Sequence, residues 1–224
     1  DERIDKPMDV FGPGWGDHAE RVKVAWNELV TEDDIVIIAG DISWGLKLDE
    51  AMADLNWIHE LPGQKVLLRG NHDLWWCRIQ YLRTLYDDMH FLQNDCYYLE
   101  ELDLAICGSR GWPTPDATTY TEHDEKMYLR EQGRLRNSLS EAKKKGASKI
   151  IMAMHYPPAK VEETEFTRVM QEYGVTQCVY GHLHGMVAWT NGIKGEHGGI
   201  DYKLVSLDYL GAKPKLIYDS EQEM

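Results

Sequence analysis

Apolar residues follow two patterns along this chain, and the two patterns alternate. Continuous apolar runs are typical of strands buried on both faces, and helical spacing indicates amphipathic helices packed against them. Strands that alternate with helices predict βαβ units and a mostly parallel sheet. The buried-strand pattern occurs at residues 35–39, 65–69, 149–154 and 177–180. The helical pattern occurs at residues 18–30, 47–59, 75–86, 122–145 and 163–173.

Two further regions carry shorter strand patterns. Residues 97–99 and 102–107 lie on either side of a short acidic turn, which predicts an antiparallel pair. Residues 200–207 and 214–218 predict additional short strands in the last part of the chain.

Polar residues follow the buried-strand patterns directly, at the point where each strand is expected to end. Because parallel strands bring their carboxyl ends to one edge of a sheet, these side chains are expected to lie together there. A single such loop is often an ordinary polar turn, but matching groups after several strands favour a functional site. The residues are Asp41, Asn71, His72, Asp73, His155, His182 and His184.

The residue types in this set suit a metal centre. A carboxylate, an amide oxygen and several imidazoles are ligands for borderline divalent ions such as Mn, Fe, Zn, Co or Ni. One carboxylate can bridge two such ions about 3.5–4 Å apart, and the pair can clamp a phosphate and activate water.

The amino-acid composition limits the classes of binding partner and the cellular compartment that are expected for this protein. The formal net charge of −14 disfavours binding to nucleic-acid backbones, although bound metals could still attract a phosphate substrate. No apolar run reaches the roughly 18 residues of a transmembrane helix. The four cysteines show no CxxC spacing, which disfavours a zinc site or a disulfide framework. We expect them to be reduced thiols in a cytoplasmic protein. They are Cys77, Cys96, Cys107 and Cys178.

Four motifs occur along residues 17–190, in the order Gly40-Asp41, Gly70-Asn71-His72-Asp73, His155 and Gly181-His182-Leu183-His184. With these motifs in this order, the chain resembles the calcineurin-like metallophosphoesterases. The resemblance implies an α/β fold, a four-layer α/β/β/α sandwich of two mixed sheets flanked by helices. It also implies hydrolysis of phosphomonoesters or phosphodiesters at a two-metal centre, with a metal-bound hydroxide as the nucleophile. A small phosphorylated substrate is expected, with nucleotides among the candidates.

The resemblance also implies roles for individual residues. Asp41 would bridge the metals, and His184 would belong to the second metal site. The first site would be completed by Asn71, His155 and His182. His72 would lie near the phosphate without binding metal, with Asp73 orienting it.

Several other side chains are candidates for substrate contact. Arg110 could hold a phosphate with its planar donor fork, or it could simply pair with a surface acid. Trp75 and Trp112 lie in or beside the site loops and could stack on a substrate, although tryptophan is more often part of the core.

One family motif is missing from the sequence. An Asp-x-His motif at the end of the first strand completes the second metal site in the family, and no such motif ends a first strand in this sequence. We expect residues 1–224 to form a single domain whose first strand lies upstream of Asp1. The alternative is a degenerate, non-hydrolytic scaffold that binds a partner or ligand. A nuclease would share the chemistry but fits the acidic charge poorly, and the oligomeric state stays open.

Overall fold

The computed structural model describes residue 8 and residues 12–223 of the chain. Its strands form two sheets. The three-stranded sheet has the order β1 (Ile35–Ile38), β2 (Gln64–Leu68) and β3 (Met89–Leu92), all parallel. The six-stranded sheet is mixed, and its order is β4 (Cys96–Leu99), β5 (Leu104–Ser109), β6 (Lys149–Met154), β7 (Gln177–Tyr180), β9 (Ile200–Leu204) and β8 (Gly195–His197).

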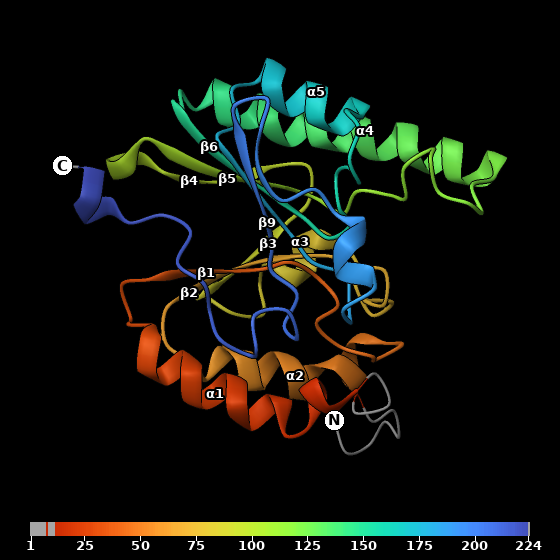
Figure 1. Cartoon of the computed structure of the whole chain (residues 1–224). Coiled ribbons are helices and arrows are strands. Elements are labelled where there is room, and N and C mark those ends of the chain that lie inside the picture. Colours follow the sequence, from red (N-terminus) through yellow and green to blue (C-terminus); the bar gives the residue numbers. More distant parts are fainter. Residues whose placement is uncertain (1–7, 9–11, 224) are drawn as a thin grey trace.

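Helices cover the outer faces of both sheets (Figure 1). None of the helices in the described part of the chain is both long and apolar enough to cross a membrane. The α-helices are α1 (His18–Leu29), α2 (Leu48–His59), α3 (Ile79–Leu82), α4 (Glu122–Lys144) and α5 (Glu165–Glu172). Short 3-10 turns are η2 (Pro13–Trp15), η3 (Glu100–Leu102), η4 (Ala188–Asn191) and η5 (Ser220–Glu223).

The layers follow the order helix, sheet, sheet, helix, which confirms the expected α/β/β/α sandwich. Both sheets were expected to be mixed, but the described strands of the three-stranded sheet are all parallel. Figure 1 shows α1 and α2 on one side of the stacked sheets, and α4 and α5 on the other. The outer cores contain Leu55 and Phe91 on the α2 side, and Leu135 and Phe166 on the α4 side. The two sheets pack on each other through Val66, Leu68, Leu92, Ile106, Ala153 and Val179.

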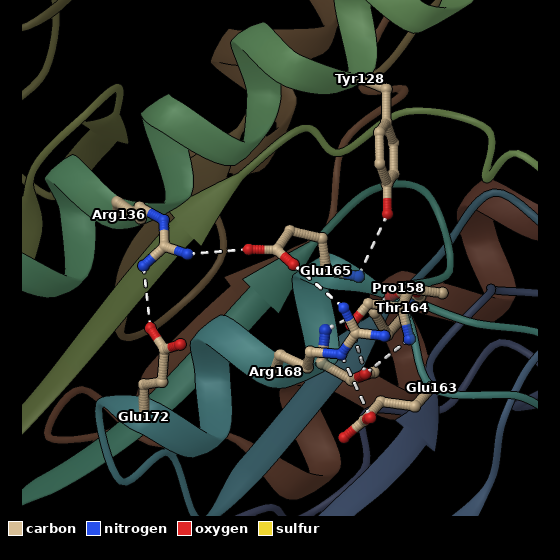
Figure 2. A network of polar contacts seen from close by, with 9 residues as sticks. Tyr128, Arg136, Pro158, Glu163, Thr164, Glu165, Arg168 and Glu172 are labelled. Carbon is tan, nitrogen blue, oxygen red and sulfur yellow. Dashed lines mark hydrogen bonds and ion pairs between the residues drawn. The ribbon is translucent and has the colours of Figure 1, made fainter.

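Charged side chains join α4 to α5 across the surface (Figure 2). Arg136 forms ion pairs with Glu165 at 2.8 Å and with Glu172 at 2.9 Å. The Glu165 amide also donates to the Tyr128 hydroxyl. Such exposed pairs contribute little to stability, so the buried apolar contacts hold the two helices together.

The strand and helix predictions were mostly accurate, and the antiparallel pairing of residues 97–99 with the following strand is confirmed. The helix expected at residues 75–86 shrinks to the four residues of α3. Trp75 and Trp76 produced that apolar pattern, but both rings are buried in the core from an irregular segment.

The remaining differences concern strands. Strands β3 and β8 carry no clear sequence signal, and no strand forms at residues 214–218. In addition, β1 was expected to be buried on both faces, yet all four of its residues are half-buried. Among the described strands, β1 pairs only with β2 and so lies at an edge of its sheet.

Candidate metal centre

The loops that follow β1 and β2 touch each other closely. A Cβ added to Gly70 would lie 2.1 Å from Asp41 Oδ1, and one added to Gly40 would lie 2.6 Å from the Gly70 nitrogen. Asp41 itself has a φ of 56°, a left-handed conformation that is uncommon outside glycine. Two glycines and one strained aspartate therefore place the Asp41 carboxylate beside the Gly70–Asp73 loop.

A fully buried carboxylate, that of Asp73, connects these two loops. Its Oδ2 accepts hydrogen bonds from the Asp41 and Gly70 amides at 2.8 and 2.7 Å. Its Oδ1 accepts from the Ile42 amide at 2.8 Å, the Ser43 amide at 3.2 Å and Trp75 Nε1 at 3.0 Å. Burial raises the pKa of Asp73, and the backbone donors oppose that rise. The carboxylate thus fixes the backbone that carries Asp41.

These contacts differ from the role expected for Asp73. All five donors to its carboxylate come from residues other than His72, so the contacts do not support an orienting role toward that ring. The exposed His72 ring lies against the Trp44 ring, with centroids 4.1 Å apart. The His72 amide donates to Asp41 Oδ1 at 2.8 Å, which holds His72 at the rim of the site.

The other sheet contributes His155, which follows β6 and is almost completely buried. Its Nδ1 donates to the Ala39 carbonyl at 2.9 Å, and this bond ties β6 to the end of β1. Burial lowers the pKa of His155 to about 4, so the ring is neutral near pH 7. With the proton on Nδ1, the lone pair of Nε2 faces the loops that follow the three-stranded sheet.

His182 follows β7 and completes the group. It has a φ of 68°, and its Nδ1 lies 3.2 Å from His155 Nε2. Burial lowers its pKa to about 4 as well, which keeps a second neutral imidazole available. Single ligand atoms of Asp41, His155 and His182 all lie within 4.8 Å of one another.

The arrangement of acceptor atoms fits a bound cation. Asn71 Oδ1 lies 2.7 Å from His155 Nε2, and Asp41 Oδ2 lies 3.4 Å from the same nitrogen. Because the His155 proton is used by the Ala39 carbonyl, Nε2 and Asn71 Oδ1 face each other as two acceptors. A divalent ion between them would turn this repulsion into coordination. The mixed nitrogen and oxygen donors suit a borderline transition metal.

His184 lies at a separate position from this group. Its Nδ1 donates to Asp208 Oδ1 at 2.9 Å, and Asp208 Oδ2 accepts from the Gly185 amide at 2.8 Å. A carboxylate on Nδ1 leaves Nε2 of a neutral histidine free to bind a metal. The sequence reasoning missed Asp208, although it follows the predicted strand at residues 200–207, as the other site residues follow theirs.

The candidate substrate contacts fall into two groups. Trp75 is 2% exposed and bonded to Asp73, so it is a core residue, and a substrate contact does not fit its position. Arg110 and Trp112 follow β5 beside the centre, and Arg110 Cζ lies 4.6 Å from the Trp112 ring centroid. The Trp112 indole donates to Asp124 at 3.0 Å, which fixes the ring.

Comparison with known proteins gives one long match and several limited ones. The family model for the calcineurin-like phosphoesterase matches residues 13–186, which include every candidate metal ligand. Among solved structures, a protein of unknown function from Aquifex aeolicus has a TM-score of 0.45 and 13% identity, with 88% of this chain and 80% of that chain covered.

Two curated phage proteins match short stretches. The gene 66 protein of Mycobacterium phage L5 is 44% identical over 57 residues, which are 25% of this chain and 27% of that protein. The gene 66 protein of Mycobacterium phage D29 is 38% identical over 71 residues, which are 32% of this chain and 34% of that protein. The match therefore covers well under two thirds of either phage protein.

Proposed function

Because this chain belongs to the calcineurin-like phosphoesterase family, we propose that it hydrolyses small phosphomonoesters or phosphodiesters at a centre of two divalent metal ions. The observation that carries the proposal is the convergence of acceptor atoms from Asp41, Asn71, His155 and His182. When bound, divalent ions supply Lewis acidity and lower the pKa of water, which makes a nucleophile available near neutral pH.

The residues divide between the two proposed metal positions. Asn71, His155 and His182 would hold the first ion, and Asp41 would bridge to the second. His184 would belong to the second position, because Asp208 holds its Nδ1 and leaves Nε2 for coordination. Mn, Fe, Zn, Co and Ni are the candidate ions, since the donor set excludes none of them.

His72 is the proposed acid at the leaving group. It is exposed at the rim, its backbone is tied to Asp41, and its ring is steadied by Trp44. An imidazole there can donate a proton to the departing oxygen or stabilise charge on the phosphate. A small phosphorylated compound, with nucleotides among the candidates, is the proposed substrate, and we propose a cytoplasmic location.

The first experiment measures bound metal and hydrolysis together. Protein purified without chelators is analysed by elemental mass spectrometry and assayed with p-nitrophenyl phosphate and bis(p-nitrophenyl) phosphate. About two metal equivalents and chelator-sensitive hydrolysis are expected. Asp41→Asn should lower kcat by at least about 100-fold, while retaining the backbone, because asparagine tolerates positive φ. Asp201→Asn, at a carboxylate of β9 whose side chain is 45% exposed, is the matched control.

Two results would contradict the proposal. Hydrolysis that survives exhaustive metal removal would exclude the metal-dependent mechanism. A folded protein that binds no metal after incubation with manganese and zinc would instead favour the non-hydrolytic scaffold.

A further inference from the structure

The guanidinium group of Arg110 is incompletely bonded. Its Nε is buried and has no hydrogen-bond partner among the described residues. The nearest carboxylate oxygen, Glu131 Oε1, lies 3.7 Å from Arg110 Nη2, beyond hydrogen-bond distance. Arginine has five N–H donors, and buried donors without acceptors destabilise a fold. The side chain is 14% exposed, so part of the guanidinium remains accessible to a ligand.

Glu131 is shared with other donors, and at 3.7 Å it forms only an ion pair with Arg110 and no hydrogen bond. This buried carboxylate accepts from Arg134 Nη1 at 2.7 Å and from the Ser109 hydroxyl at 3.2 Å. Arg69 also lies in the electrostatic neighbourhood of Glu131 and Arg134. Two guanidinium groups, those of Arg110 and Arg134, thus share one buried glutamate, in a protein whose net charge is −14.

Arg110 is a direct neighbour of the candidate metal centre. In the β5–β6 register Ser109 pairs with Met154, so Arg110 and His155 are the first residues past the two adjacent strand ends. The Tyr156 amide donates to the Arg110 carbonyl at 2.9 Å, which continues the pairing past the strand ends. Neighbouring strands are about 4.8 Å apart, so the Arg110 backbone lies within one strand spacing of the metal-ligand backbone.

Aromatic rings restrain the guanidinium and connect it to the centre. Trp112 lies 4.6 Å from Arg110 Cζ and is itself held by its indole bond to Asp124. The Tyr156 ring lies 5.8 Å from the Trp112 ring and 4.2 Å from the His182 ring, centroid to centroid. The arginine fork is therefore pre-organised beside a continuous row of rings that ends at a candidate metal ligand.

We propose that Arg110, supported by the charge of Arg134, binds a second phosphate of the substrate while the scissile phosphate occupies the metal centre. This inference rests on the proposed function and narrows it to esters that carry a second phosphoryl group. A phosphate accepts bidentate hydrogen bonds from an arginine fork, and the terminal Nη donors of Arg110, which lie beyond hydrogen-bond distance of Glu131, would supply them. A substrate with one anionic group would leave those donors to water.

Three compounds with one carbon skeleton test the subsite. They are butyl phosphate, butane-1,4-diyl bisphosphate and 4-(phosphonooxy)butanoate, assayed with the manganese-loaded protein. The bisphosphate is expected to exceed butyl phosphate by about 10- to 100-fold in kcat/KM, mainly through KM, after statistical correction for its two ends. Arg110→Gln should bring that ratio close to one. Arg136→Gln, whose guanidinium pairs with Glu165 and Glu172 on α5 (Figure 2), should leave the ratio unchanged.

A binding measurement separates the subsite from hydrolysis. Butane-1,4-diylbisphosphonate and butylphosphonate cannot be hydrolysed at carbon–phosphorus bonds, and their affinities can be measured by calorimetry on the same manganese-loaded proteins. Tighter binding of the bisphosphonate that is lost in Arg110→Gln supports the subsite even if no ester is hydrolysed, an outcome that would count against the proposed function alone.

Three outcomes would overturn the subsite itself. Hydrolysis with equal kcat/KM for butyl phosphate and the bisphosphate would leave the function standing and remove the subsite. An undiminished ratio in Arg110→Gln would show that another residue binds the second phosphate. An equal advantage for the carboxylate compound would replace phosphate selectivity with general anion binding.

Discussion

Replacing Asp73 by asparagine tests whether one buried carboxylate holds the loops of the candidate centre. The substitution keeps the size of the side chain but replaces one acceptor oxygen with an NH₂ group. If that group takes the place of Oδ2, the bonds from the Asp41 and Gly70 amides are lost. If it takes the place of Oδ1, three bonds are lost instead. At least two buried donors must therefore lose their acceptor.

The expected cost follows from these two bonds. A hydrogen bond to a charged group contributes about 1.5–3 kcal/mol, so two of them amount to about 3–6 kcal/mol. The total stability of a domain is only about 5–15 kcal/mol, so Asp73→Asn should leave a marginally stable protein. With a slope of about 2 kcal/mol per molar urea, the unfolding midpoint should fall by about 1.5–3 M.

Urea unfolding followed by tryptophan fluorescence and circular dichroism measures this shift. Asp201→Asn, on β9 with a side chain 45% exposed, is the matched control and should change stability by less than about 1 kcal/mol. A midpoint for Asp73→Asn within about 0.3 M of wild type would refute the loop-holding role. Unchanged stability together with lost phosphoester hydrolysis would instead restore the orienting role toward His72.

Three more predictions concern the same region. Gly70→Ala should abolish metal binding in elemental analysis, because its Cβ would overlap Asp41. The control is Gly133→Ala in α4, outside this region, whose Cβ would meet no atom within 4 Å. That control should stabilise the protein by about 0.5–1 kcal/mol in urea titrations. Burial lowers the pKa of His155 and His182 to about 4 from 6.5, so the unfolded chain binds more protons between these values. The free energy of unfolding of metal-free protein should therefore rise with pH across that window, and a flat profile would contradict the burial of neutral imidazoles. Asp208→Asn should lower the affinity for the second metal equivalent by about 10- to 100-fold in a competition titration, with the first equivalent unaffected.

The sequence located the candidate centre because each contributing loop directly follows a recognisable strand. The rule that parallel strands end at one edge correctly brought together Asp41, Asn71, His155 and His182. It could not show that two sheets, rather than one, supply these residues, because periodicity alone does not say which strands pair. The resemblance to a known family supplied the two-sheet architecture.

The misses have a different cause. Residues 75–86 have helical apolar spacing, but Trp76 packs on Phe91 and bonds to Gln93, and these tertiary contacts override the local pattern. The contacts of the Asp73 carboxylate with the β1 loop were also not predicted. Nothing in the sequence indicates that its carboxylate meets the amides of a loop about thirty residues earlier. Such long-range polar contacts become visible only in three dimensions.

The distribution of the ligands over both sheets has a consequence for how the protein must be handled. An ion held by Asp41 and Asn71 on one side and by His155 and His182 on the other would act as a non-covalent cross-link between the halves of the sandwich. An ion that binds only the folded chain at a hundredfold excess over its Kd adds about 2.7 kcal/mol of stability. Yield and melting temperature would then depend on the metal content of the growth medium and on chelators in the purification buffer. Batches that differ in metal content would therefore differ in stability although their sequence is the same.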